Sequence, residues 1–441
     1  MCTVEKKIFW LNQIDKITQK PFVRNVAVVT MGTAGAQAIT MAFAPIITRI
    51  YGPEAFGLLG AFMAIVHITT PLAALSYPIA IVLPGDDADA MGLTQLSLMI
   101  ALAMTASVTF VLLFFGEQIS KLLNLNAIES FLMLIPVAMI SSVGLAVMSQ
   151  WVIRKQLFKI KARVHVVYAL LLNGALAGVG LVKPVAAVLV VLASLGALVH
   201  TAMLFVGLRR ETSGSSTQKH RAAPLKMLAK RHLDFPLYRT PQVLFNAASQ
   251  SLPLIMLASF FGPAAAGFYA LSRSVLALPT ALIGKSVADV FYPRINRAVL
   301  SKEKATRLIS KATLALLITG FLPFALIVAF GPSLFSLVFG KDWSMAGEYG
   351  RWLAIWLYFG FTNRPSVSAM PVLDLQGFFL RYEILSVLAR ILALFSGFML
   401  FESDLLAVGL FSVTGALLNI FLILVTLHHA RRIDTQQAET L

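Results

Sequence analysis

Apolar runs of about 20 residues recur along this chain, and a helix of that length crosses the hydrocarbon core of a bilayer, which is roughly 30 Å thick. Hydrophobic residues make up 58% of the sequence and charged residues 13%, whereas soluble domains average about 45–50% and about 25%. A chain this apolar has too little polar surface to cover a water-soluble globule. We therefore predict an all-α polytopic membrane protein.

The apolar segments predict about twelve transmembrane helices, six in each half of the chain. The segment 209–240 between the halves is basic, contains Ser and Gly, and is long enough to be a cytoplasmic linker. We therefore expect two six-helix lobes, 25–208 and 241–428, with cytoplasmic segments at 1–24 and 429–441. The predicted spans are 26–48, 56–83, 91–115, 128–153, 164–182, 185–208, 241–261, 265–292, 309–330, 350–372, 382–401 and 405–428.

The distribution of Lys and Arg predicts the orientation of these spans. Basic residues gather in the N-terminal segment, in the loops after the fourth and eighth spans, and in the central linker. Cytoplasmic loops are enriched in Lys and Arg, so both termini should be cytoplasmic. One loop disagrees, because Asp86, Asp87 and Asp89 fall on the same side. The net charge of +16 then reflects attraction to an anionic leaflet, and we expect no nucleic-acid partner.

A repeated motif indicates an internal duplication. Residues 52–57 and 262–267 both read Gly-Pro-x-x-x-Gly, and each copy lies between the first two spans of its half. Pro84 and Pro293 follow the two copies at nearly the same distance, and each ends a span. Because each half has an even number of spans, the repeat should be parallel. Such a repeat places a central cavity between two helix bundles and suits alternating access.

Charged residues inside predicted spans are the first functional candidates, because each costs about 2.5–3.5 kcal/mol on insertion scales. Guanidinium groups bind phosphate oxygens bidentately, which offsets the desolvation of an anionic headgroup. Instead of binding substrate, Lys285 can extend to the membrane–water interface or pair with Asp289. Arg49 can likewise anchor the end of its span among the lipid headgroups. Arg364 precedes Pro365, where we expect a break in the span. The charged substrate-binding candidates are Arg273, Arg390, Arg364, Lys285 and Arg49.

Neutral polar residues in the spans are a second group of candidates. Gln37, Asn246 and Gln250 are of a type that binds sugar hydroxyls, although such residues more often hydrogen-bond neighbouring helices. Asp289 and His67 are candidates for ion or proton coupling. For His67 a structural hydrogen bond is the favoured expectation.

The sequence lacks the signatures of an enzyme. It has no phosphate-binding Gly-rich loop, no His-Glu-x-x-His and no Gly-x-Ser-x-Gly motif. Its one cysteine, Cys2, excludes a cysteine-based metal site and an intramolecular disulfide. We therefore expect a transporter without metal or cofactor.

Several short motifs are spread over most of the chain, and their combination is specific enough to indicate a protein family. They comprise residues 45–57, 80–84, 235–238, 252–253, 266–273, 279–284, 290–293 and 339–347. Together they resemble the polysaccharide-biosynthesis flippases of the Wzx type, which handle O-antigen and capsule units. The resemblance implies the multidrug/oligosaccharidyl-lipid/polysaccharide exporter fold, a MATE-like arrangement of two lobes around a central cavity.

The same resemblance implies a function. Proteins of this family move undecaprenyl-pyrophosphate-linked oligosaccharides from the inner to the outer leaflet of the bacterial inner membrane, for O-antigen, capsule or exopolysaccharide synthesis. The polymerase and chain-length proteins of that pathway would be its partners, beside the lipid bilayer. Related lipid II flippases have a cavity arginine in their eighth span, which Arg273 matches. They usually have fourteen spans and further arginines in the first span, where this chain has Gln37 and Phe43, so lipid II is disfavoured as substrate.

Two other functions compete with a flippase. A multidrug or cation antiporter of the same fold should have an acidic cavity, whereas the charged residues in these spans are mostly basic. A membrane glycan polymerase or ligase should have a large periplasmic catalytic loop, and none is predicted here. Both are therefore less favoured than a flippase.

Overall fold

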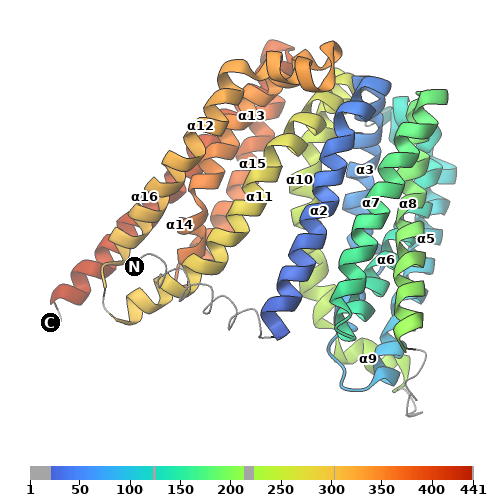
Figure 1. Ribbon diagram of the computed structural model, residues 1–441, viewed down its shortest axis with the longest axis horizontal. Coiled ribbons are helices and arrows are strands. Elements are labelled where there is room, and N and C mark those ends of the chain that lie inside the picture. Colours follow the sequence, from blue (N-terminus) through green and yellow to red (C-terminus); the bar gives the residue numbers. More distant parts are fainter. Residues whose placement is uncertain (1–20, 123–125, 213–222, 302, 440–441) are drawn as a thin grey trace, which may run out of the picture. The chain divides into compact units, whose positions relative to one another are not determined.

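The computed structural model describes residues 21–122, 126–212, 223–301 and 303–439. Every regular element in these four segments is a helix (Figure 1), which confirms the all-α prediction. Most of the predicted N-terminal segment and the side chains of residues 278–290 lie outside this description.

Long helices separated by short connections make up the first half. The elements are α2 (Pro21–Ile50), α3 (Pro53–Ala73), α4 (Tyr77–Ala80), α5 (Asp87–Leu122), the 3-10 helix η1 (Asn126–Leu134), α6 (Ile135–Arg154), α7 (Phe158–Val182) and α8 (Ala186–Thr212).

The second half begins with a short helix and a π-helical turn and then repeats the pattern of long helices. The elements are α9 (Leu225–Arg231), η2 (Phe235–Arg239), α10 (Thr240–Phe261), α11 (Pro263–Leu300), α12 (Ala305–Phe339), the 3-10 turn η3 (Lys341–Trp343), α13 (Ser344–Thr362), α14 (Arg364–Ala369), α15 (Gln376–Phe401) and α16 (Asp404–Glu439).

Ten helical stretches of the described residues are long and apolar enough to cross a membrane, so the chain is a multi-pass membrane protein. They match ten of the twelve predicted spans. The other two predictions fall on α11 and α13. Part of α11, residues 278–290, lies outside the described side chains, and α13 is rich in Gly, Trp and Tyr. The count of twelve therefore stays a prediction.

Two predicted spans are interrupted. The span predicted at 56–83 is wrong as a continuous helix, because α3 ends at Ala73 and Leu75 and Ser76 adopt left-handed conformations with φ of 48° and 58°. Pro78 then lies in the first turn of α4, where its missing N–H is tolerated. The break expected beside Pro365 is confirmed, since α13 ends at Thr362 and α14 begins at Arg364.

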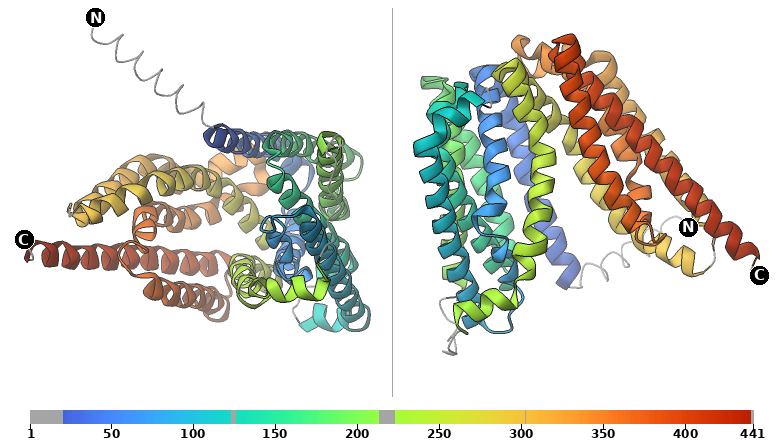
Figure 2. Two further views of the ribbon diagram at one scale, coloured as in Figure 1. Left: turned by 90° about the horizontal axis from the view of Figure 1, so that it is seen from below. Right: turned by 180° about the vertical axis from the view of Figure 1, so that it is seen from behind.

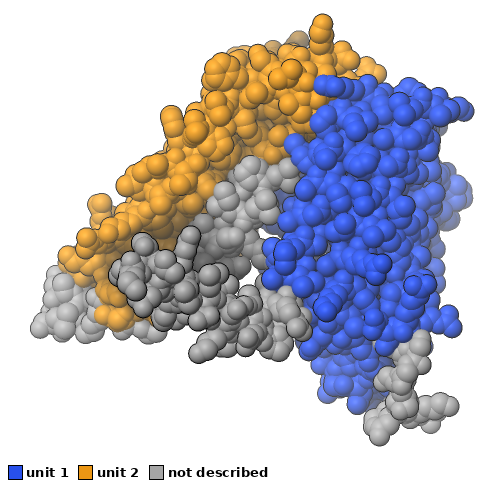
Figure 3. Space-filling view, viewed as in Figure 1, with its two compact units in different colours: residues 1–51, 62–251 blue, residues 52–61, 252–441 orange. Residues whose placement is uncertain are grey.

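The chain forms two compact units, coloured separately in Figure 3. Unit 1 comprises residues 1–51 and 62–251, and unit 2 comprises residues 52–61 and 252–441. In unit 1, α2 packs on α7 and α6 packs on α8. In unit 2, α13 packs on α11, α12 and α16, and α16 lies along α15 (Figure 2). The predicted lobe boundaries remain a proposal.

The two copies of the Gly-Pro-x-x-x-Gly motif contact each other within unit 2. A Cβ atom on Gly57 would lie 1.6 Å from the carbonyl oxygen of Pro263, and one on Gly267 would lie 2.1 Å from that of Pro53. The contact is reciprocal, as a local pseudo-twofold axis between the copies requires. Glycine at both positions therefore lets the first turns of α3 and α11 touch backbone to backbone.

Candidate functional site

Arg390 is held among aromatic rings in the middle of α15. Its Nε donates a hydrogen bond to the carbonyl oxygen of Ser386, one turn earlier, at 3.2 Å. Its guanidinium carbon lies 5.1 Å from the ring centre of Trp356 on α13 and 5.7 Å from that of Phe411 on α16. The two rings pack edge to face at 5.1 Å. They provide a cation–π environment that stabilises the charge within the apolar layer.

Helix α11 brings two more residues to Arg390. Its guanidinium interacts electrostatically with Tyr269 and Arg273, which are one helical turn apart on α11, and with Tyr382 and Glu383 on α15. We call Tyr269, Arg273, Tyr382 and Arg390 the basic cluster. The cluster joins Arg273 and Arg390, two of the charged candidates predicted from the sequence.

Tyr269 is fully buried in this cluster. Its ring contacts that of Phe411 at 6.4 Å, yet its hydroxyl has no hydrogen-bond partner within the described part of the chain. A buried hydroxyl without a partner is uncommon and costs about 1–3 kcal/mol. This hydroxyl therefore keeps an unused donor in the interior of unit 2.

No carboxylate neutralises Arg390 at ion-pair distance among the described residues. Glu383 is its acidic neighbour but makes no ion pair with it. The two terminal guanidinium nitrogens therefore keep their donors for another acceptor. Their fork geometry suits a phosphate group.

Arg364 does not belong to the basic cluster. It is exposed at the first residue of α14 and makes no hydrogen bond or ion pair with the described residues. The neighbouring Asn363 is buried, and its side-chain nitrogen donates to Asn419 at 3.0 Å. The amide therefore links α16 to the break between α13 and α14.

The neutral candidates and Arg49 lie in unit 1. Gln37 and Arg49 are exposed on α2. Gln250 donates to Asn246 at 2.9 Å on the exposed side of α10, so this pair is already partly satisfied within its own helix. Their part in substrate binding stays a prediction.

The coupling candidates are only partly described. His67 is exposed on α3 and makes no hydrogen bond with the described residues, so the structural hydrogen bond expected for it is not found. The side chains of Lys285 and Asp289 lie outside the described residues. Their pairing stays a prediction.

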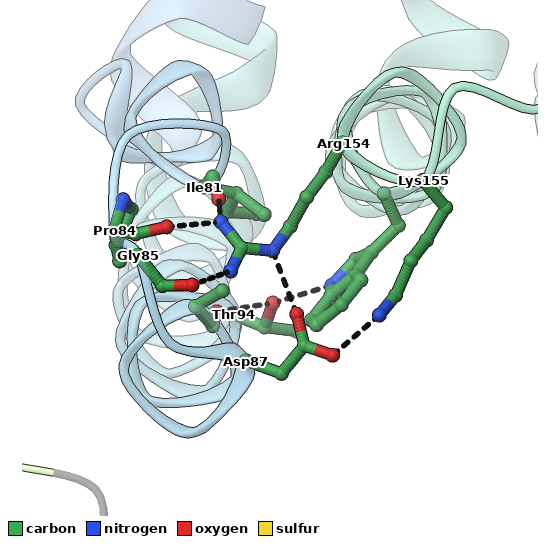
Figure 4. Close-up of polar contacts among 9 residues, drawn as sticks. Ile81, Pro84, Gly85, Asp87, Thr94, Arg154 and Lys155 are labelled. Atoms are coloured by element: carbon green, nitrogen blue, oxygen red, sulfur yellow. Dashed lines mark hydrogen bonds and ion pairs between the residues drawn. The ribbon is translucent and has the colours of Figure 1, made fainter. Parts of the chain in front are cut away.

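An arginine network that sequence reasoning missed fixes the end of α6 (Figure 4). Arg154 binds Asp87 through Nε at 3.0 Å, and its other nitrogens donate to the carbonyl oxygens of Ile81, Pro84 and Gly85. Lys155 also pairs with Asp87. Asp87 of the acidic loop that disagrees with the charge rule is thus neutralised by the basic end of α6 and has a structural role.

A second missed group lies between α7 and α8. The rings of Tyr168 and His200 stack at 4.4 Å, and His165 lies 5.3 Å from His200. His200 is buried. Only the helical spacing of His165 and Tyr168 hints at this cluster in the sequence, because its third member comes from another helix.

Comparison with known proteins identifies the family of this chain. A family model described as "Polysaccharide biosynthesis protein" matches residues 46–348, which is more than half of the chain. The chain belongs to this polysaccharide biosynthesis protein family. No curated protein matches it. The resemblance carried by the sequence motifs is thereby confirmed.

Solved structures show how this family member folds. The lipid II flippase MurJ in an inward closed conformation is 10% identical, with a TM-score of 0.66 over 93% of this chain and 91% of that one. A point mutant of a MATE protein is 14% identical, with a TM-score of 0.53 over 95% of this chain and 96% of that one. An outward-facing multidrug resistance MATE family transporter of the MOP superfamily is 13% identical, with a TM-score of 0.52. The match covers 94% of this chain and 97% of that one. The MATE-like fold is therefore confirmed.

Proposed function

We propose that this polysaccharide biosynthesis protein is a flippase. It moves undecaprenyl-pyrophosphate-linked oligosaccharides from the inner to the outer leaflet of the bacterial inner membrane by alternating access. These units serve O-antigen, capsule or exopolysaccharide synthesis. Both termini lie on the cytoplasmic side, as the basic loops indicate.

The observation that carries the proposal is the basic cluster. A diphosphate headgroup that enters an apolar layer loses its hydration, which is unfavourable unless charged donors replace the water. Arg390 lies in a membrane span without an ion-paired carboxylate among the described residues, beside a second arginine and a tyrosine hydroxyl that lacks a partner there. Two guanidinium groups and one hydroxyl supply the donors that a diphosphate needs.

The same cluster disfavours a cation antiporter. Two arginines outweigh the one acidic neighbour, Glu383, so that a cation would be repelled. The chemistry of the cluster therefore fits an anionic substrate.

A complementation experiment tests the proposal. In a strain that lacks this gene, Arg273→Gln and Arg390→Gln should each reduce surface polysaccharide roughly tenfold or more, because a lost charged hydrogen bond is worth about 1.5–3 kcal/mol. Lipid-linked oligosaccharide should accumulate in the inner leaflet. Arg381→Gln is the matched control, since Arg381 is exposed on the same helix and bonds only to the carbonyl oxygen of Gly377 among the described residues.

Three results distinguish the alternatives. Normal polysaccharide in both variants, at normal protein levels, would remove the basic cluster from the mechanism. A deletion strain that accumulates nothing in the inner leaflet would contradict a flippase. A change in drug sensitivity with unchanged polysaccharide would favour an antiporter.

A further inference from the structure

A groove of about 550 Å³ lies between α7 and α8 in unit 1. The two helices pack side by side, as Figures 1 and 2 show. None of the residues that line the groove belongs to the basic cluster. Its walls are apolar and include Ile160, Val164, Val199, Met203 and Val206.

The groove walls are open to the hydrocarbon layer. Both helices are membrane spans, and Val199 and Val206 are 48% and 47% exposed. Gly207 lets the helices approach closely, because a Cβ atom there would lie 2.6 Å from Cγ2 of Ile160. Surface of this kind in a membrane span is covered by hydrocarbon chains rather than by water.

Charged side chains lie at one end of the groove. Arg163 comes from the first turns of α7, and Arg210 and Glu211 come from the last turn of α8. None of these three makes a hydrogen bond or ion pair with a residue that the structure describes. These helix ends adjoin the basic loops, where lipid headgroups lie. The arginines therefore present available donors at headgroup level, with a net positive charge.

We propose that this groove binds one anionic phospholipid. An acyl chain lies along the apolar walls, and the lipid phosphate lies between Arg163 and Arg210. Basic pockets between transmembrane helices select anionic headgroups in this way. The two arginines and the single glutamate at one end give the groove a net positive charge, which matches an anionic headgroup.

Lipid binding to the purified full-length protein in detergent tests this site, with phosphatidylglycerol and phosphatidylcholine compared by native mass spectrometry. Phosphatidylglycerol should bind more tightly, and Arg163→Gln or Arg210→Gln should each weaken its binding about fivefold. Lys159→Gln removes the same charge from the same end of α7 outside the groove and should change little. Glu211→Gln should strengthen binding, because it removes the one acidic wall residue.

A second variant separates the contribution of the lipid's acyl chain from that of its headgroup. Ala202→Trp should fill the apolar part of the groove and abolish phosphatidylglycerol binding while the thermal unfolding temperature without lipid is kept. Glycerol phosphate, a headgroup without chains, should not compete with the lipid. Equal binding of the two lipids, equal effects of Arg163→Gln and Lys159→Gln, or full competition by glycerol phosphate would overturn the proposal.

Discussion

At the scale of single residues, aromatic rings stabilise the charge of Arg390 in an apolar layer. The chain surrounds it with the faces of Trp356 and Phe411 and one backbone carbonyl, instead of an ion-paired carboxylate from the described residues. An ion pair would satisfy the guanidinium and leave it little affinity for a ligand. Aromatic faces stabilise the charge and leave its outer donors available.

This arrangement predicts energetic coupling between Arg390 and Trp356. In a double-mutant cycle with Arg390→Met and Trp356→Leu, the coupling free energy of unfolding should be about 0.5–2 kcal/mol, the range of partly desolvated cation–π pairs. Thermal or denaturant unfolding in detergent measures it. The same cycle with Arg381→Met in place of Arg390→Met should give no coupling. Additive effects in the Arg390 cycle would rule out the interaction.

At the scale of helices, close glycine contacts set how the elements of unit 2 pack. The crossing of α3 and α11 depends on Gly57 and Gly267, and that of α12 and α13 on Gly331 and Gly347, where a Cβ atom would lie 2.5 and 2.4 Å from the opposite carbonyl oxygen. The duplicated motif thus has a structural reason beyond its turn, since each copy completes the contact of the other.

The motif gives a clear prediction for stability. Gly57→Ala or Gly267→Ala should destabilise the fold by about 3 kcal/mol, because the new methyl group meets backbone rather than a movable side chain. Gly52→Ala is the control, since a Cβ atom there meets nothing within 4 Å. Thermal unfolding followed by size-exclusion chromatography measures both. A Gly57→Ala protein as stable as the Gly52→Ala protein would refute the contact.

The breaks in the helices show what the sequence could and could not predict. Pro365 marks the end of α13, because a proline restricts the residue before it. At the end of α3, Pro78 stands beside the break, but nothing in the sequence marks the left-handed conformations of Leu75 and Ser76, neither of which is a glycine.

At the scale of the whole molecule, a multi-pass membrane protein with this fold is predictable from apolar length and motif content, which do not depend on tertiary detail. The site is predictable only in part. Arg273 and Arg390 stand out in the sequence because charge within a span is costly. Tyr269, Trp356 and Phe411 do not, because aromatic residues are common in spans and only packing decides which of them surround a charge.

The central claim is that this family member binds an anionic lipid-linked headgroup through the basic cluster. The most direct test is the affinity of the purified protein for an undecaprenyl-pyrophosphate-linked oligosaccharide. We predict that the double variant Arg273→Gln/Arg390→Gln binds it roughly hundredfold more weakly than the wild type, with about 1.5 kcal/mol lost at each arginine, while Arg381→Gln binds it normally. Unchanged affinity in a folded double variant would contradict the claim.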